Sequence, residues 1–139
     1  SVQLQIQQTD VGDLSALYGL QLDTTMDPKT AKDNPPVFAE ADKGGVPRVM
    51  GGKGIAYQSR LKGNFEVEGW NTAEVIAKGD TIVHILNGQV VNRGKNVRLV
   101  DPNDPTSSKP LTRGRIALEI EAAELDFRNV EIRSLETSR

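Results

Sequence analysis

The feature of this chain that most constrains its fold is an alternation of apolar and polar residues on both sides of a two-residue turn. Thr81 to Leu86 is followed by Asn87-Gly88 and then by Gln89 to Asn92. Alternation is typical of half-buried strands, and Asn-Gly supplies the positive-φ residues that a tight hairpin needs. The sequence therefore predicts an antiparallel hairpin, preceded by a strand over Ala73 to Lys78 that is joined to it through Gly79-Asp80.

The two-residue turn also predicts which residues share a face, because it sets Leu86 opposite Gln89, Ile85 opposite Val90 and His84 opposite Val91. The expected core face holds Val83, Ile85 and Val90. The other face is expected to be mixed, and it holds Ile82, His84, Leu86, Gln89, Val91 and Arg93. His84, the one histidine of the chain, is thus expected outside the core. It is either hydrogen-bonded to a neighbouring strand or half exposed, or it lines a groove.

Alternation recurs at both ends of the chain. Val2, Leu4 and Ile6 share one parity near the start, and Ile116, Leu118 and Ile120 share one near the end. After a turn near Ala122-Ala123, the segment Leu125 to Leu135 predicts a last strand. Its apolar parity changes at Arg128-Asn129, which predicts a β-bulge there.

Two Pro- and Gly-rich segments, Asp23 to Lys62 and Asp101 to Pro110, predict long loops. Within the first, Val37-Phe38 and Ile55 to Gln58 are the pieces expected to pair. Roughly eight short strands separated by such turns predict an all-β fold, a sandwich or a barrel. A length of 139 residues suits one domain over residues 1–139. Because Ser1-Val2-Gln3 already lies within an alternating strand, we expect a fragment or a processed product.

Composition excludes several classes of site and partner. The chain has no Cys and one His, which excludes disulfides, thiolate metal sites and sites with two imidazoles. Its 17 basic and 19 acidic residues are interspersed, and no apolar run approaches the length of a membrane span. We therefore expect no nucleic-acid partner, no membrane insertion, no metal and no cofactor.

Some polar and aromatic residues have both a structural and a functional interpretation. The row Gln3, Gln5 and Gln7 is either a solvated sheet face or a set of amides that bond to sugar hydroxyls. Trp70 is either a packing residue or a platform for a pyranose ring. The carboxylate pairs Glu119/Glu121 and Glu124/Asp126 have the alternate spacing of glycosidase acids. They lack the third acid of an E-x-D-x-x-E strand, and we interpret them as solvated faces.

Several motifs together resemble the 3-keto-disaccharide hydrolase family. They are "GWNTAEVIAKGDTIVHILNGQVV" (Gly69 to Val91), "GRIALEIEAAELDFRNVEIRSL" (Gly114 to Leu135) and the opening "VQLQIQQTD" with "SALYGL". The chain departs from the family at Gln3 and Gln7, which replace acidic residues, and at Glu119, which replaces Gln. The strands that precede this opening in the family are also absent.

The resemblance implies the C-terminal part of a concanavalin A-like jelly-roll β-sandwich with long irregular loops, in which a second chain or subunit supplies the missing strands. It also implies a secreted or periplasmic bacterial protein with an oligosaccharide or glycoside substrate. The implied activity is hydrolysis of 3-keto-disaccharides: a base removes a proton next to the ketone, the glycosidic oxygen leaves, and water adds.

In that activity His84 would be the base or a donor to the enediolate. Trp70 would stack on a ring, and the residues that orient hydroxyls would be Gln5, Tyr18, Asn71 and Arg128. Two alternatives stay open. One is a non-catalytic carbohydrate-binding module, and the other is an interaction domain whose Asp23 to Lys62 insertion docks a protein partner.

Overall fold

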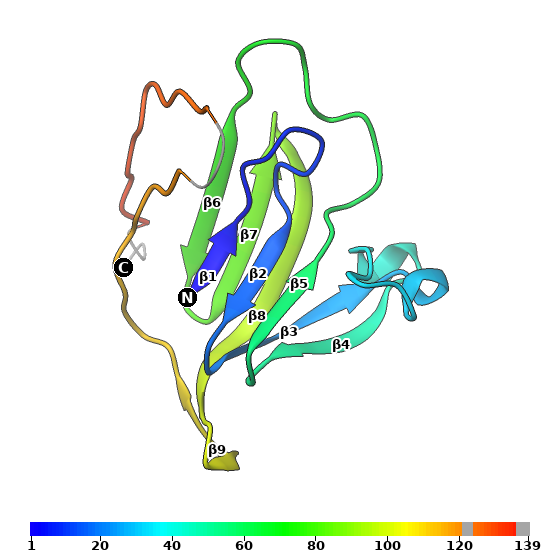
Figure 1. Ribbon diagram of the computed structural model, residues 1–139, viewed down its shortest axis with the longest axis vertical. Coiled ribbons are helices and arrows are strands. Elements are labelled where there is room, and N and C mark those ends of the chain that lie inside the picture. Colours follow the sequence, from blue (N-terminus) through cyan, green and yellow to red (C-terminus); the bar gives the residue numbers. More distant parts are fainter. Residues whose placement is uncertain (121–123, 136–139) are drawn as a thin grey trace.

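The alternating segments pair into two antiparallel sheets, which the computed structural model describes over residues 1–120 and 124–135 (Figure 1). The small sheet has the order β1 (Val2–Leu4), β2 (Leu14–Leu17) and β5 (Ile55–Gln58). The large sheet has the order β4 (Val46–Gly51), β3 (Leu20–Met26), β8 (Gln89–Asp101), β7 (Thr81–Leu86) and β6 (Ala73–Lys78), and β9 (Asp104–Pro110) also pairs with β8. The prediction of an all-β sandwich with long irregular loops is confirmed.

Short 3-10 turns, Pro28–Thr30 and Ala41–Lys43, interrupt the long connection between β3 and β4. Within the described ranges no helix has the length and apolar character needed to cross a membrane.

The predicted hairpin is present, but its faces are the reverse of the expectation. Ile85 pairs with Val90 as predicted, whereas His84 pairs with Asn92 because the register shifts between His84 and Ile85. The buried face carries His84, Leu86 and Val91, and the face expected to be core is half-buried. Periodicity defines two faces without saying which one another sheet covers. Figure 1 shows β1 and β2 lying over β7 and β8, and His84 Nδ1 meets the Gly12 carbonyl oxygen just before β2.

The prediction of strands near the C-terminus is wrong for the residues that the structure describes. Neither 111–120 nor 124–135 contains a strand, so Arg128-Asn129 is no β-bulge, and the turn expected at Ala122-Ala123 lies outside the described residues. Ile116, Leu118 and Ile132 are each more than half exposed. Alternation produces a strand only where a sheet edge offers ladder hydrogen bonds. In the described part of these segments the one backbone hydrogen bond to a strand is from Leu111 N to Val97 O of β8, at 3.0 Å.

The Pro-rich loops are shorter than expected. Asp101 to Pro110 was expected to be a loop, but most of it is β9, which pairs with the end of β8. An edge strand of this kind tolerates proline because one side of it needs no ladder bond. Inside Asp23 to Lys62, Ile55–Gln58 pairs as predicted, and Val37 and Phe38 form single bridges to Ser59 and Met26. The prediction missed β4 and the end of β3, which pair with each other from Asp23↔Val49 to Met26↔Val46.

Buried polar side chains connect the two sheets alongside the apolar core. The larger apolar cluster contains Leu14, Ala16, Leu20, Leu22, Met50 and Val97, and a smaller one contains Val11, Leu86 and Val91. We call four buried polar residues the interior polar layer: Thr24, Gln58, His84 and Asn92. Gln58 Nε2, from the small sheet, donates to Thr24 Oγ1 at 2.8 Å and to Asn92 Oδ1 at 3.0 Å in the large sheet.

Replacing Gln58 by Leu is expected to lower the free energy of unfolding by about 2–4 kcal/mol, measured by urea denaturation. The change leaves Asn92 Oδ1 without this donor and Arg48 Nη1 without the Gln58 Oε1 acceptor, which lies 3.0 Å away. Buried groups that lose their partners carry the full cost of desolvation. The exposed Gln89→Leu variant is the control and should shift stability by less than about 0.5 kcal/mol. Equal effects from the two changes would contradict the layer's structural role.

Candidate functional site

His84 lies between the two sheets and is 1% exposed. Its Nδ1 is 3.1 Å from the carbonyl oxygen of Gly12. A carbonyl can only accept, so Nδ1 carries the proton and Nε2 is left as an acceptor. Within the described residues Nε2 is buried and has no hydrogen-bond partner. Burial lowers the His84 pKa to about 4, so the ring is neutral at pH 7. The expectation that His84 lies outside the core is therefore wrong.

Gln5 lies on the side of the small sheet that faces away from the core. Leu14 and Ala16 point into the core, so alternation places the cross-strand row Gln3, Ser15 and Tyr57 on the opposite side. Gln5 and Asp13 extend this side, because Gln5 N donates to Asp13 O at 3.0 Å. We call this surface the outer face, and its accessible side chains are Gln3, Gln5, Asp13 and Tyr57, whereas Ser15 of the same row is buried at 1% exposure. It combines amides, a carboxyl and a half-exposed phenol, which are groups suited to a sugar.

Asp13 is a candidate that the sequence reasoning missed. Its pKa is raised to about 6, chiefly because the carboxyl is partly buried. The backbone N–H of Arg60 donates to Asp13 Oδ1 at 2.7 Å and lowers the pKa of Asp13. The negative charges of Asp10 and Glu66 raise it further. A sequence signal was available: Asp13 directly precedes the alternating strand Leu14–Leu17, with parity opposite to Leu14.

A second group of predicted residues meets at the loop before β6. The guanidinium carbon of Arg128 lies 4.0 Å from the centre of the Trp70 ring, a cation–π contact. Trp70 is 49% exposed. The Asn71 side chain is used in hydrogen bonds within the protein, because its Oδ1 accepts from Asn87 Nδ2 and from Val67 N, both at 2.8 Å. These bonds attach the loop to the β7–β8 turn. Trp70 of this loop and Arg128 of the C-terminal segment are exposed and could contact a ligand.

Tyr18 occupies the turn between β2 and β3, where it is 75% exposed and has a φ of +41°. The predicted site residues thus lie at separate places, with His84 inside, Gln5 on the outer face, and Tyr18 and Trp70 in different loops. The backbone of Gly12 links His84 and Gln5. Gly12 N donates to Gln5 O at 2.9 Å while Gly12 O accepts from His84.

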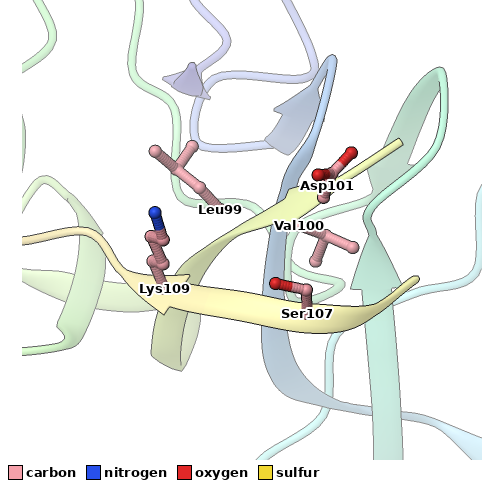
Figure 2. A pocket seen from close by; sticks show the side chains of 5 residues that line it. All are labelled: Leu99, Val100, Asp101, Ser107 and Lys109. Carbon is pink, nitrogen blue, oxygen red and sulfur yellow. The ribbon is translucent and has the colours of Figure 1, made fainter. Parts of the chain in front are cut away.

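Two shallow surface hollows lie away from all of these residues. Figure 2 shows one of them between β8 and β9, lined by Leu99, Val100, Asp101, Ser107 and Lys109. The other lies over β6 and β7 and is lined by Ile76, Lys78, Thr81 and Val83. In residues 1–120 and 124–135, no group of three or more His, Asp or Glu side chains is arranged to hold a metal ion.

The structure is a two-sheet antiparallel β-sandwich with amide, carboxyl and aromatic side chains on one strand face. The family model described as a 3-keto-alpha-glucoside-1,2-lyase-like domain matches residues 1–133. The chain belongs to this family, which confirms the resemblance and supports a carbohydrate-active function. No curated protein and no solved structure matches the chain.

The pKa values of His84 and Asp13 predict opposing effects of pH on stability. Between pH 6.5 and about 4 the unfolded chain protonates His84 and the folded chain does not, so acidification removes stability, by roughly 3 kcal/mol over the whole range. Between pH 3.8 and about 6 the folded chain keeps a proton on Asp13 that the unfolded chain releases. Stability from Asp13 is therefore lost as pH rises.

These two slopes should largely cancel in the wild type between pH 4 and 6. Urea denaturation at pH 4.5, 5.5 and 6.5 measures them. Asp13→Asn should make the protein more acid-sensitive than wild type, and His84→Gln should make it less so, each compared by slope rather than by absolute stability. Identical slopes in all three proteins would contradict the two pKa shifts.

Proposed function

We propose that this chain cleaves α-glucosides that carry a ketone at C3, by elimination across C1 and C2. The match to the 3-keto-alpha-glucoside-1,2-lyase-like domain over residues 1–133 is the observation that carries the proposal. The ketone acidifies the C2–H bond, so a base can remove that proton. The electron pair then forms the C1=C2 bond, the C1–O bond breaks, and the leaving oxygen takes a proton. Addition of water to the resulting enone completes a net hydrolysis.

This reaction requires a base whose pKa lies near the working pH and a surface that holds the sugar. His84 has the chemistry of a base, because it is neutral with a lone pair on Nε2. Its burial means that a substrate would reach Nε2 only between the sheets. The outer face also supports the proposal, because Asp13, Gln5 and Gln3 share one side of the small sheet and are each partly exposed.

The activity is tested with 4-nitrophenyl 3-keto-α-glucoside. Purified protein should release nitrophenol and form the sugar enone, and deuterium at C2 should slow the release if proton removal limits the rate. The matched control is the same glucoside with a hydroxyl at C3, which lacks the acidified C2–H bond and should not be cleaved. Absence of any release from the keto substrate, in protein shown to be folded by its thermal transition, would rule the proposal out.

A non-catalytic carbohydrate-binding module is the second candidate. The observation that favours it is the half-exposed Trp70 ring with the Arg128 guanidinium over it. Aromatic platforms of this kind bind pyranose rings without chemistry.

For this candidate, Trp70→Ala should weaken binding of unoxidised oligosaccharides at least tenfold by calorimetry, while the exposed Val75→Ala variant should bind as the wild type does. Binding that is unchanged in Trp70→Ala would exclude this surface.

A further inference from the structure

We propose that Asp13 is the base that removes the C2 proton, and that the outer face of the small sheet is the surface on which the sugar ring lies. This inference rests on the proposed function and adds the catalytic residue to it.

The first argument is the geometry of the carboxyl. Asp13 Oδ1 accepts the backbone N–H of Arg60 at 2.7 Å, which fixes the orientation of the group. Over the described ranges no donor bonds to Asp13 Oδ2, and the side chain is partly exposed. A carboxylate held through one oxygen and open at the other is arranged to take a proton from a bound molecule.

The second argument is the set of groups beside it. Gln5 pairs with Asp13 through a backbone hydrogen bond, and Gln3, two residues before Gln5, lies on the same outer face. Gln3 Nε2 donates to Glu119 Oε2 at 3.3 Å, so a residue from the C-terminal segment also reaches this surface. Tyr57 is 49% exposed on the strand at the other side of β2. Amides, a carboxylate and an aromatic ring provide hydrogen bonds for hydroxyls and a flat contact for a pyranose.

The third argument is the charge around Asp13. The groups that act on it are Asp10 and Glu66, which favour its protonated form, and Arg60, which opposes them. The Arg60 guanidinium is engaged elsewhere: its Nη2 donates to Thr9 O at 2.9 Å and lies 3.6 Å from Glu66 Oε1. Burial is the main cause that raises the pKa of Asp13 to about 6, and the charges of Asp10 and Glu66 add to it, which makes Asp13 a stronger base than an ordinary aspartate.

His84 takes part as a positioning residue in this arrangement. It donates to the carbonyl oxygen of Gly12, whose carbonyl carbon is bonded to the nitrogen of Asp13. Asn92 Nδ2 donates to the same oxygen at 3.4 Å. The interior polar layer thus anchors the peptide unit from which the carboxyl projects.

The step balances without any further reactant. Asp13 Oδ2 takes the proton from C2 as the C2–H electron pair becomes the enolate of the C3 ketone. The enolate collapses to form the C1=C2 bond and the C1–O bond breaks, and the departing oxygen recovers the proton from the carboxylic acid. The products are the enone and the free alcohol, and Asp13 is again ionised.

The test compares Asp13→Asn with wild type on 4-nitrophenyl 3-keto-α-glucoside. Asn keeps an oxygen that can accept the Arg60 N–H but cannot take the proton. kcat/KM should fall at least 100-fold, and exchange of the C2 proton in heavy water should be lost. Wild-type kcat/KM should rise with pH through about 6, because Asp13 must be ionised. Asp13→Glu should keep this rise at a lower rate, and the exposed Asp42→Asn control should match the wild type.

The outcomes separate the inference from the function on which it rests. A wild type that is active, with Asp13→Asn folded and within threefold of it, overturns Asp13 as the base and leaves the proposed function standing. A folded wild type that is inactive on the keto substrate overturns both. Loss of activity in Asp13→Asn that still shows a cooperative thermal transition, with the pH dependence retained in Asp13→Glu, supports the inference.

Discussion

The arrangement of this domain depends on the hydrogen bond between Gln58 of the small sheet and Asn92 of the large one. Both side chains are fully buried, and their amides are 3.0 Å apart. Apolar contacts hold two sheets together but permit sliding, whereas a pair of buried amides is satisfied in one relative position. Arg48 and Thr24 complete the bonding of Gln58 at 3.0 and 2.8 Å, so one residue fixes where β5 lies over β3 and β8.

The same layer determines the conformation of the loop that leads into β2. Gly12 O receives His84 and Asn92, and Gly12 N bonds to Gln5. Gly12 has a φ of +104°, and a Cβ placed on it would lie 2.5 Å from Val91 Cγ2. Both its backbone conformation and the close approach of the core require glycine here. Asp13 follows directly, so its position on the outer face is a consequence of bonds made in the interior.

Local pattern predicted the elements of this fold better than it predicted their surroundings. The hairpin around Asn87-Gly88 follows from alternation and turn chemistry, which act within a few residues. The buried side of that hairpin, and the absence of a strand at Ile116 to Ile120, depend on which sheet or edge lies alongside. The candidate site shows the same division, because Gln5 was found from its strand and Asp13 was missed: its pKa depends on burial and on Arg60, 47 residues away.

His84 and Asp13 acquire opposite pKa shifts from a single cause. Burial penalises whichever form of a group is charged, so it lowers the pKa of the imidazole and raises that of the carboxyl. The two residues lie on either side of the Gly12 carbonyl, one inside the sandwich and one at its surface. Near neutral pH the inner group stays uncharged and preserves the polar layer, while the outer group is ionised and able to accept a proton. The reverse arrangement, with the aspartate between the sheets and the histidine at the surface, would not work in the same way. A charged carboxylate between the sheets would lack a compensating partner.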